Sequence, residues 1–276
     1  MSHFTVKDLG NAVYRIEGQG AVGMYLIVGN EKAVLIDTGL GTHNVAEFVK
    51  TLTDKPVEVL LTHGHLDHAG GMYYFDEVHL SHKDVPVLKG NTKQDRLAYM
   101  ALLRDFMGKT DWEEKDICEV RDVRIKDIAD GEEFELGDRK LRAVAFPGHT
   151  HGSMAFYDEL TRFLFVGDAC NNSTFLFLEE STSVSEYLET LKFIKMQWLP
   201  KVSHMIISHD FDTVPESCVE DVMECCERVL AGTDDKETFV HPNPMFNEMT
   251  VRWAAKGAAG RVDKFGNLAY NYSNVT

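Results

Sequence analysis

Six consecutive residues constrain this chain more than any other feature of its sequence: His63-Gly64-His65-Leu66-Asp67-His68. Four side chains that can bind a metal ion fall in this segment, directly after an apolar run at residues 57–61 that is typical of a buried strand. A loop at the carboxyl end of a strand can turn several side chains toward one point. We therefore expect His63 and His65 to bind one metal ion. Asp67 and His68 would reach a second, and the density of the motif argues against a chance cluster of surface histidines.

Three further candidate ligands each follow an apolar, strand-like run: His149, Asp168 and His209. A single His or Asp at the end of a strand is more often a capping or core residue than a ligand. Three such residues in succession, after so dense a first motif, favour the ligand interpretation. The predicted metal ligands are therefore His63, His65, Asp67, His68, His149, Asp168 and His209.

The rest of the chain alternates between strand-like and helix-like segments, which predicts an α/β protein. Strands are expected at residues 13–17, 23–28, 33–36, 57–61, 78–80, 141–146, 154–157, 163–166, 205–207 and 268–270. Helices are expected near residues 43–53, 184–198 and 216–231, with Gly232 as the C-cap of the last. Residues 83–117 are helix-prone, charged and rich in large apolar side chains, which predicts a helical insertion.

The ligand pattern resembles that of the metallo-β-lactamase superfamily. The resemblance rests on His63-x-His65-x-Asp67-His68 followed by the three later ligands, and on Asp37-Thr38-Gly39, over roughly residues 10–210. It implies a four-layer αβ/βα sandwich, as one domain over residues 1–276 with the helical insertion at about 83–117, and with both metals at one edge of the two sheets. It also implies a ligand assignment: His63, His65 and His149 for the first metal, Asp67, His68 and His209 for the second, and Asp168 bridging both.

The reaction that this resemblance implies is hydrolysis of a small-molecule ester, thioester or lactone. Two divalent metal ions, expected to be Zn2+ with Fe or Mn as alternatives, would hold a bridging hydroxide as the nucleophile. Asp67 is also the candidate catalytic residue, as a proton relay. The alternatives are a phosphodiesterase that uses the same metal site and an iron-dependent persulfide dioxygenase. Metals with a purely structural role are a weaker alternative, because structural zinc sites are usually rich in cysteine.

Two positions refine the comparison within the superfamily. Zinc β-lactamases often have Cys where this chain has Asp168, and flavodiiron proteins have Glu where it has His65, so neither activity is expected. The ligand set is similar to that of glyoxalase II and acyl-homoserine lactonases. No basic pattern typical of glutathione binding follows His209. Lactonases of this fold use a tyrosine near the metals, for which Tyr187 and Tyr25 are both candidates.

The composition narrows the choice of partners. A formal net charge of -16 repels phosphate backbones and anionic membranes, so we expect a small-molecule substrate, no nucleic acid and no membrane. Whether the protein forms a homo-oligomer stays open. Five cysteines without a CxxC pair, and an N-terminus without an apolar signal core, predict a reduced, cytoplasmic protein. We expect Cys170 to be a buried thiol, and leave open whether His151 contacts substrate or is structural.

One further expectation concerns the insertion. Its apolar and aromatic side chains, Phe106, Met107 and Trp112 among them, predict that residues 83–117 lie over the metal site and shape substrate choice.

Overall fold

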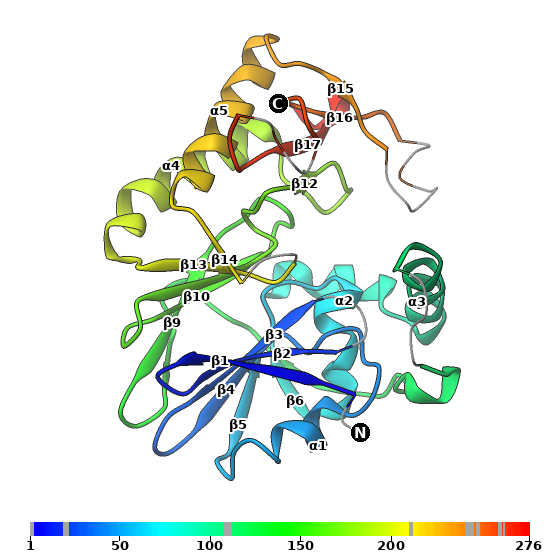
Figure 1. Cartoon of the computed structure of the whole chain (residues 1–276), viewed down its shortest axis with the longest axis vertical. Helices are drawn as coiled ribbons and strands as arrows, with labels where there is room; N and C mark the ends of the chain where they lie inside the picture. Colours follow the sequence, from blue (N-terminus) through cyan, green and yellow to red (C-terminus); the bar gives the residue numbers. More distant parts are fainter. Residues whose placement is uncertain are drawn as a thin grey trace. The chain divides into compact units, whose positions relative to one another are not determined.

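The structure is a computed structural model that describes residues 3–18, 22–107, 112–209, 212–240, 246, 249–258, 261 and 263–276 (Figure 1). The chain divides into two compact units. The first unit comprises Met1–Val144, Asp158–Thr161 and Ser208–Asp212, and the second comprises Ala145–Tyr157, Arg162–Ile207 and Thr213–Thr276. The single domain over residues 1–276 stays a prediction.

The first unit is built on a seven-stranded sheet whose strands follow the order of the sequence. Its strands are β1 (Thr5–Gly10), β2 (Val13–Glu17), β3 (Gly23–Val28), β4 (Ala33–Ile36), β5 (Val57–Leu60), β6 (Glu77–His79) and β7 (Arg124–Lys126). Strands β1 to β4 pair antiparallel, whereas β4 to β7 pair parallel. Because Ile36 lies opposite Leu60 in the parallel β4–β5 pair, the residues after both strands leave the sheet at the same edge. A β8–β9 hairpin (Glu133–Glu135 and Lys140–Ala145) also pairs antiparallel.

The helices of the first unit include the predicted insertion. They are α1 (Val45–Val49), α2 (Leu66–Ala69), η1 (Gly70–Tyr74), η2 (His82–Gly90), α3 (Lys93–Met107) and η3 (Glu114–Asp116). Helix α3, the long helix of the insertion in Figure 1, turns Met100 into a buried cluster with Leu40 and Ile117. Leu66 of α2 and Trp112 pack against the same cluster. The insertion is therefore helical as predicted and packs on the helix that carries Asp67 and His68.

The second unit contains two groups of strands and a pair of helices. Strands β10 (Met154–Asp158), β11 (Phe163–Gly167), β13 (His204–Ile207) and β14 (Thr213–Val214) are neighbours in the order β14-β13-β11-β10. A four-stranded sheet has the order β12-β17-β16-β15, from β12 (Thr174–Leu176), β17 (Leu268–Asn271), β16 (Val251–Trp253) and β15 (Glu237–Thr238). Helices α4 (Val184–Gln197) and α5 (Ser217–Ala231) pack against each other. The described part of this unit also contains the short turns η4 (Leu199–Lys201) and η5 (Tyr272–Asn274).

The expected C-cap of the last helix is observed. Gly232 ends α5 with a φ of 69°, in the left-handed region that favours glycine at a helix C-terminus. Within the described ranges, every helix is too short or too polar to cross a lipid bilayer.

Candidate metal centre

The motif His63–His68 spans the end of the loop after β5 and the first residues of α2. His63 lies three residues after Leu60, and His65 is the N-cap of α2. Asp67 and His68 belong to the single turn of α2. The short helix thus gathers the motif's donors: the ring centroids of His63 and His65 are 4.8 Å apart, and those of His63 and His68 are 4.1 Å apart.

Glycine at position 64 is required by close packing. A Cβ atom there would lie 2.8 Å from the carbonyl oxygen of Asp84 and 2.9 Å from Cβ of Val87. The amide of Gly64 donates a hydrogen bond of 2.8 Å to Oδ2 of Asp84. The metal-binding loop is therefore fixed against η2, the first segment of the insertion.

Three side chains of the first unit have the spacing of ligands around one ion. Nε2 of His68 lies 3.4 Å from Nε2 of His209, which in turn lies 3.5 Å from Oδ2 of Asp67. Oδ2 of Asp67 lies 4.0 Å from Nε2 of His68. Tetrahedral zinc with ligand bonds of about 2.0–2.1 Å would hold neighbouring donor atoms about 3.4 Å apart. Two imidazoles and one carboxylate at these distances fit a divalent metal ion.

The second ring nitrogen of His68 is held by a buried carboxylate. Nδ1 of His68 donates a hydrogen bond of 2.8 Å to Oδ2 of Asp37, and neither side chain is exposed. A carboxylate only accepts, so the proton of His68 is on Nδ1 and Nε2 presents its lone pair. Asp37 therefore fixes both the ring orientation and the tautomer that metal binding needs.

The same hydrogen-bond network around Asp37 sets the tautomer of His63, through the hydroxyl of Thr62. The single hydroxyl proton of Thr62 goes to the carboxylate of Asp37, at 2.9 Å from Oδ2. Oγ1 of Thr62 must then accept from Nδ1 of His63, 3.0 Å away. Nε2 of His63 is left with a lone pair, as in a metal ligand.

The second unit supplies the other two predicted ligands. His149 follows β9 by four residues, and Asp168 follows β11 directly. Nδ1 of His149 donates to the carbonyl oxygen of Phe175 at 2.8 Å, so its Nε2 also presents a lone pair. That Nε2 lies 3.9 Å from Oδ2 of Asp168. Within this unit the two donors therefore face each other.

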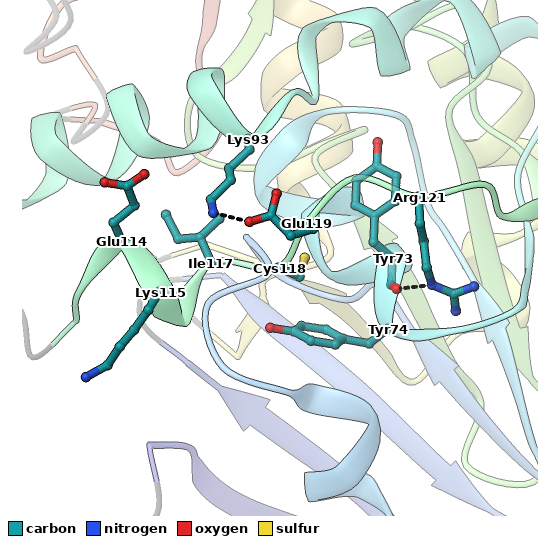
Figure 2. Close-up of a pocket in the computed structure, with 9 residues that line it drawn as sticks. All are labelled: Tyr73, Tyr74, Lys93, Glu114, Lys115, Ile117, Cys118, Glu119 and Arg121. Carbon is teal, nitrogen blue, oxygen red and sulfur yellow. Dashed lines mark hydrogen bonds and ion pairs between the residues drawn. The ribbon is translucent and has the colours of Figure 1, made fainter.

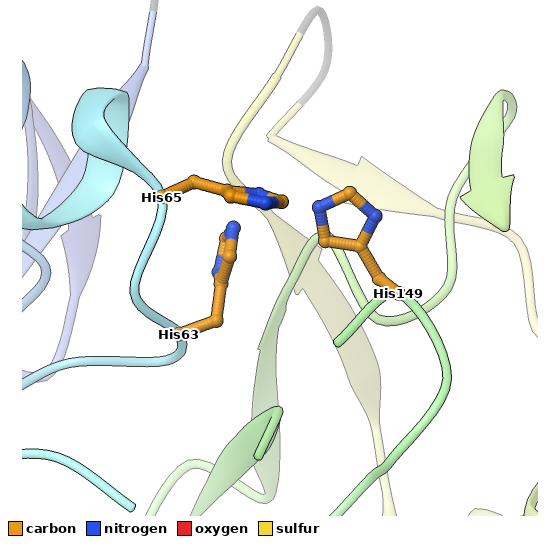
Figure 3. Close-up of side chains that lie close together, drawn as sticks. All are labelled: His63, His65 and His149. Atoms are coloured by element: carbon orange, nitrogen blue, oxygen red, sulfur yellow. The ribbon is translucent and has the colours of Figure 1, made fainter. Parts of the chain in front are cut away.

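The seven predicted ligands thus fall into two groups. The first unit brings together His63, His65, Asp67, His68 and His209, and the second brings together His149 and Asp168. Figure 3 draws His63 and His65 with His149, the three that the resemblance assigns to the first metal.

Neither tyrosine proposed from the resemblance is placed to contact substrate. Tyr187 is fully buried, its ring lies against Gly148, and its hydroxyl donates to the carbonyl oxygen of Ala169. Tyr25 is buried beneath Arg15, and burial raises the pKa of its hydroxyl above the ordinary value. Sequence reasoning missed Tyr99 instead, whose hydroxyl donates to Oδ2 of Asp67 at 3.2 Å.

Three further expectations concern Cys170, His151 and the large side chains of the insertion. Cys170 is a buried thiol as predicted, with its sulfur 3.9 Å from that of Cys218. His151 is exposed, and its backbone amide donates to the carbonyl oxygen of Glu180. Trp112 packs beside α2 with the insertion's other apolar residues, while the side chains of Phe106 and Met107 lie outside what the structure describes.

A pocket of about 800 Å³ opens beside η1 and the N-terminus of α3 in the first unit (Figure 2). It is lined by Tyr73, Tyr74, Lys93, Glu114, Lys115, Ile117, Cys118, Glu119 and Arg121. Its cationic side chains each have an acidic partner: Lys93 pairs with Glu119, Lys115 with Glu113 and Arg121 with Asp76. Because its charges are balanced locally, the pocket has no marked preference for an anion.

Comparison with known proteins gives a consistent answer. The family model described as the metallo-beta-lactamase superfamily matches residues 18–197. The chain is 28% identical over 207 residues to the Homo sapiens protein named acyl-coenzyme A thioesterase MBLAC2, covering 67% of this chain and 72% of that protein. It is 26% identical over 145 residues to the probable metallo-hydrolase YqgX of Bacillus subtilis, covering 52% and 64%. These names support the prediction of a hydrolase.

Solved structures agree on the fold. A metallo-beta-lactamase from Pontibacter korlensis superposes with a TM-score of 0.58 at 19% identity, over 81% of this chain and 99% of that one. The sec-alkylsulfatase Pisa1 from Pseudomonas sp. gives 0.60 at 15% identity, over 83% and 42%. The predicted metallo-β-lactamase fold is confirmed. The family match ends at the last residue of α4 and includes six of the seven predicted ligands. This protein belongs to the metallo-β-lactamase superfamily.

Proposed function

We propose that this protein is a dinuclear metal-dependent hydrolase that cleaves a thioester of the acyl-coenzyme A type. The observation that carries the proposal is the group of Asp67, His68 and His209, whose donor atoms have zinc-like spacing while Asp37 holds the far side of His68. The thioester is favoured over the ester and the lactone by the name of the MBLAC2 relatives.

The seven candidate ligands would hold two metal ions. His63, His65 and His149 would hold the first metal ion, and Asp67, His68 and His209 the second. Asp168 would bind both. The support for this assignment is that Nδ1 of His63, His68 and His149 each contacts an oxygen, so that the tautomer with the ring proton on Nδ1 leaves the Nε2 lone pair for a metal ion.

Bound there, two divalent ions would supply a hydroxide nucleophile at neutral pH and polarise the thioester carbonyl. Water and thioester give a carboxylic acid and a thiol, so one proton must pass from the attacking water toward the leaving sulfur. A thiol has an ordinary pKa of about 8.5, which makes its thiolate an adequate leaving group. Asp67 would accept and pass on the proton at its carboxylate, which is only slightly exposed.

The first test is a substrate panel on protein of measured metal content. An acyl-coenzyme A thioester, a lactone, a phosphodiester and a β-lactam should be compared at equal enzyme concentration. Two equivalents of zinc and turnover of the thioester alone are expected. One equivalent of iron with oxygen consumption would favour the persulfide dioxygenase, and cleavage of the phosphodiester would favour that alternative.

Replacing Asp168 with Asn tests the dinuclear arrangement itself. Asn keeps the shape but removes the negative charge that offsets two cations. We expect Asp168→Asn to bind about one metal equivalent less and to lose activity by orders of magnitude, while its circular dichroism spectrum is unchanged. The matched control is Asp54→Asn, a 93% exposed carboxylate, which should behave as wild type. Full occupancy by two metals with near-normal turnover in Asp168→Asn would reject the dinuclear model.

A further inference from the structure

The hydroxyl of Tyr99 lies against the metal-facing oxygen of Asp67. It donates a hydrogen bond to Oδ2 at 3.2 Å. The same Oδ2 lies 3.5 Å from Nε2 of His209 and 4.0 Å from Nε2 of His68. A carboxylate oxygen has two lone pairs, so Oδ2 can accept from Tyr99 with one and face a metal ion with the other.

Helix α3 holds Tyr99 in this place through a buried anchor one turn earlier. Arg96 is fully buried, and its Nη1 donates to the carbonyl oxygen of Gly70 at 2.8 Å. Its Nη2 donates to the carbonyl oxygen of Cys118 at 2.9 Å, and its guanidinium lies 5.0 Å from the centre of the Tyr73 ring. Gly70 directly follows α2, so Arg96 ties α3 to the helix that carries Asp67.

Apolar packing reinforces the anchor along the same face of α3. Met100 is buried with Leu40 and Ile117, and Leu97 and Leu103 pack against that cluster together with Leu66 of α2. Residues three and four apart on a helix share a face, so Arg96, Tyr99, Met100 and Leu103 all turn toward α2. The position of the Tyr99 hydroxyl is therefore set by buried contacts on both sides of it.

We propose that Tyr99 is a positioning residue of the second metal site, through which the insertion controls metal retention. It fixes the orientation of the Asp67 carboxylate, so that Oδ2 faces the ligand nitrogens of His68 and His209. This role rests on the proposed function, because it assigns Tyr99 to the same metal centre. It gives the insertion a role in building the site.

The test is Tyr99→Phe, which keeps the ring and its packing but removes the hydroxyl. Loss of a hydrogen bond that orients a metal ligand typically weakens metal affinity by about 10–100-fold. We expect the weaker of the two zinc dissociation constants, measured by competition with a chelator, to rise by that factor while the tighter one is unchanged. The electronic absorption spectrum of the cobalt(II)-substituted protein should change in the bands of the second site alone.

Tyr74→Phe is the matched control, because the Tyr74 hydroxyl also donates to an oxygen of the first unit, the carbonyl of Gly41 at 3.3 Å. It should leave both zinc constants and the cobalt spectrum as in wild type. Zinc constants and a spectrum in Tyr99→Phe that match Tyr74→Phe would overturn the positioning role and leave the proposed function standing. Wild-type protein that takes up no zinc or cobalt would overturn the proposed function and the positioning role together.

Discussion

Asp37 is a buried carboxylate of the first unit whose hydrogen bonds lead to two predicted metal ligands. It has no exposed surface, and its φ of 59° lies in the left-handed region that is costly for a residue with a side chain. The carboxylate accepts from the amide of Thr62 at 2.8 Å, from the Thr62 hydroxyl and from Nδ1 of His68. A buried charge in a strained backbone persists only where surrounding contacts hold it, and here those contacts end at two predicted ligands.

Asp37→Asn should therefore weaken metal binding although Asp37 is not itself a predicted metal ligand. The amide has one acceptor oxygen in place of two and no charge, so it cannot serve both Thr62 and His68. We expect zinc affinity at the second site to fall by about 10–100-fold. Competition with a chelator measures it.

The control for Asp37→Asn is Asp158→Asn, which alters another fully buried carboxylate of the same unit, paired with Arg139. It should lower the unfolding temperature and leave zinc affinity unchanged. Equal zinc affinity in Asp37→Asn and wild type would show that His68 needs no carboxylate partner.

The candidate ligands can be recognised in the sequence at this scale, but the groups that hold them in place cannot. Four donors within six residues, directly after a strand, are recognisable by their chemistry and their spacing. Tyr99 lies 32 positions from Asp67, and only the packing of α3 on α2 brings its hydroxyl there. The sequence does not show how α3 packs, and it therefore points to Tyr187 and Tyr25 instead. Tyr187 is buried with its hydroxyl on a backbone carbonyl, and Tyr25 is buried against Arg15.

Among the elements of the seven-stranded sheet, central strands followed the sequence closely while edge strands did not. Strands β2, β3 and β4 occupy the expected residues, because apolar runs mark strands that are buried. Strand β1 was missed because nearly all of its residues are exposed and polar ones interrupt it. Strand β7, Arg-Ile-Lys, is too short and charged to be distinguished from a loop, and only pairing with β6 makes it a strand.

Helix α4 was predicted within one residue at its C-terminus, and its N-terminus has a capping box that can be tested. The hydroxyl of Ser183 accepts from the amide of Glu186 at 3.2 Å, while the Glu186 carboxylate accepts from the amide of Ser183 at 3.0 Å. Ser183→Ala should reduce the free energy of unfolding by about 1 kcal/mol, measured by urea denaturation.

Thr190→Ala, a change at a partly exposed position within the same helix, is the control for this cap. It removes only a hydroxyl bonded to the carbonyl of Glu186 and should not destabilise the protein. A Ser183→Ala variant as stable as Thr190→Ala would show that the cap contributes nothing measurable.

On the scale of the whole molecule, the ligand set is divided between the two compact units. Five predicted ligands belong to the first unit and two to the second. No single unit therefore contains the complete set that the family resemblance assigns to two metals. The sequence alone could predict this set only through its resemblance to a known family, because the spacing from His68 to His149 contains no information about distance in space.

The net charge of the whole chain leads to the last prediction. At -16 it repels an acyl-coenzyme A substrate, whose phosphates are also negative, and salt screens that repulsion. The Debye length shrinks from about 30 Å at 0.01 M to about 8 Å at 0.15 M ionic strength. We expect kcat/KM for the coenzyme A thioester to rise about 2–10-fold over this range, because like-charge repulsion slows encounter. A thioester of a small uncharged thiol is the control and should show no such rise. If kcat/KM for the coenzyme A thioester falls with salt instead, a locally positive surface must guide the substrate, and the overall charge does not govern its approach.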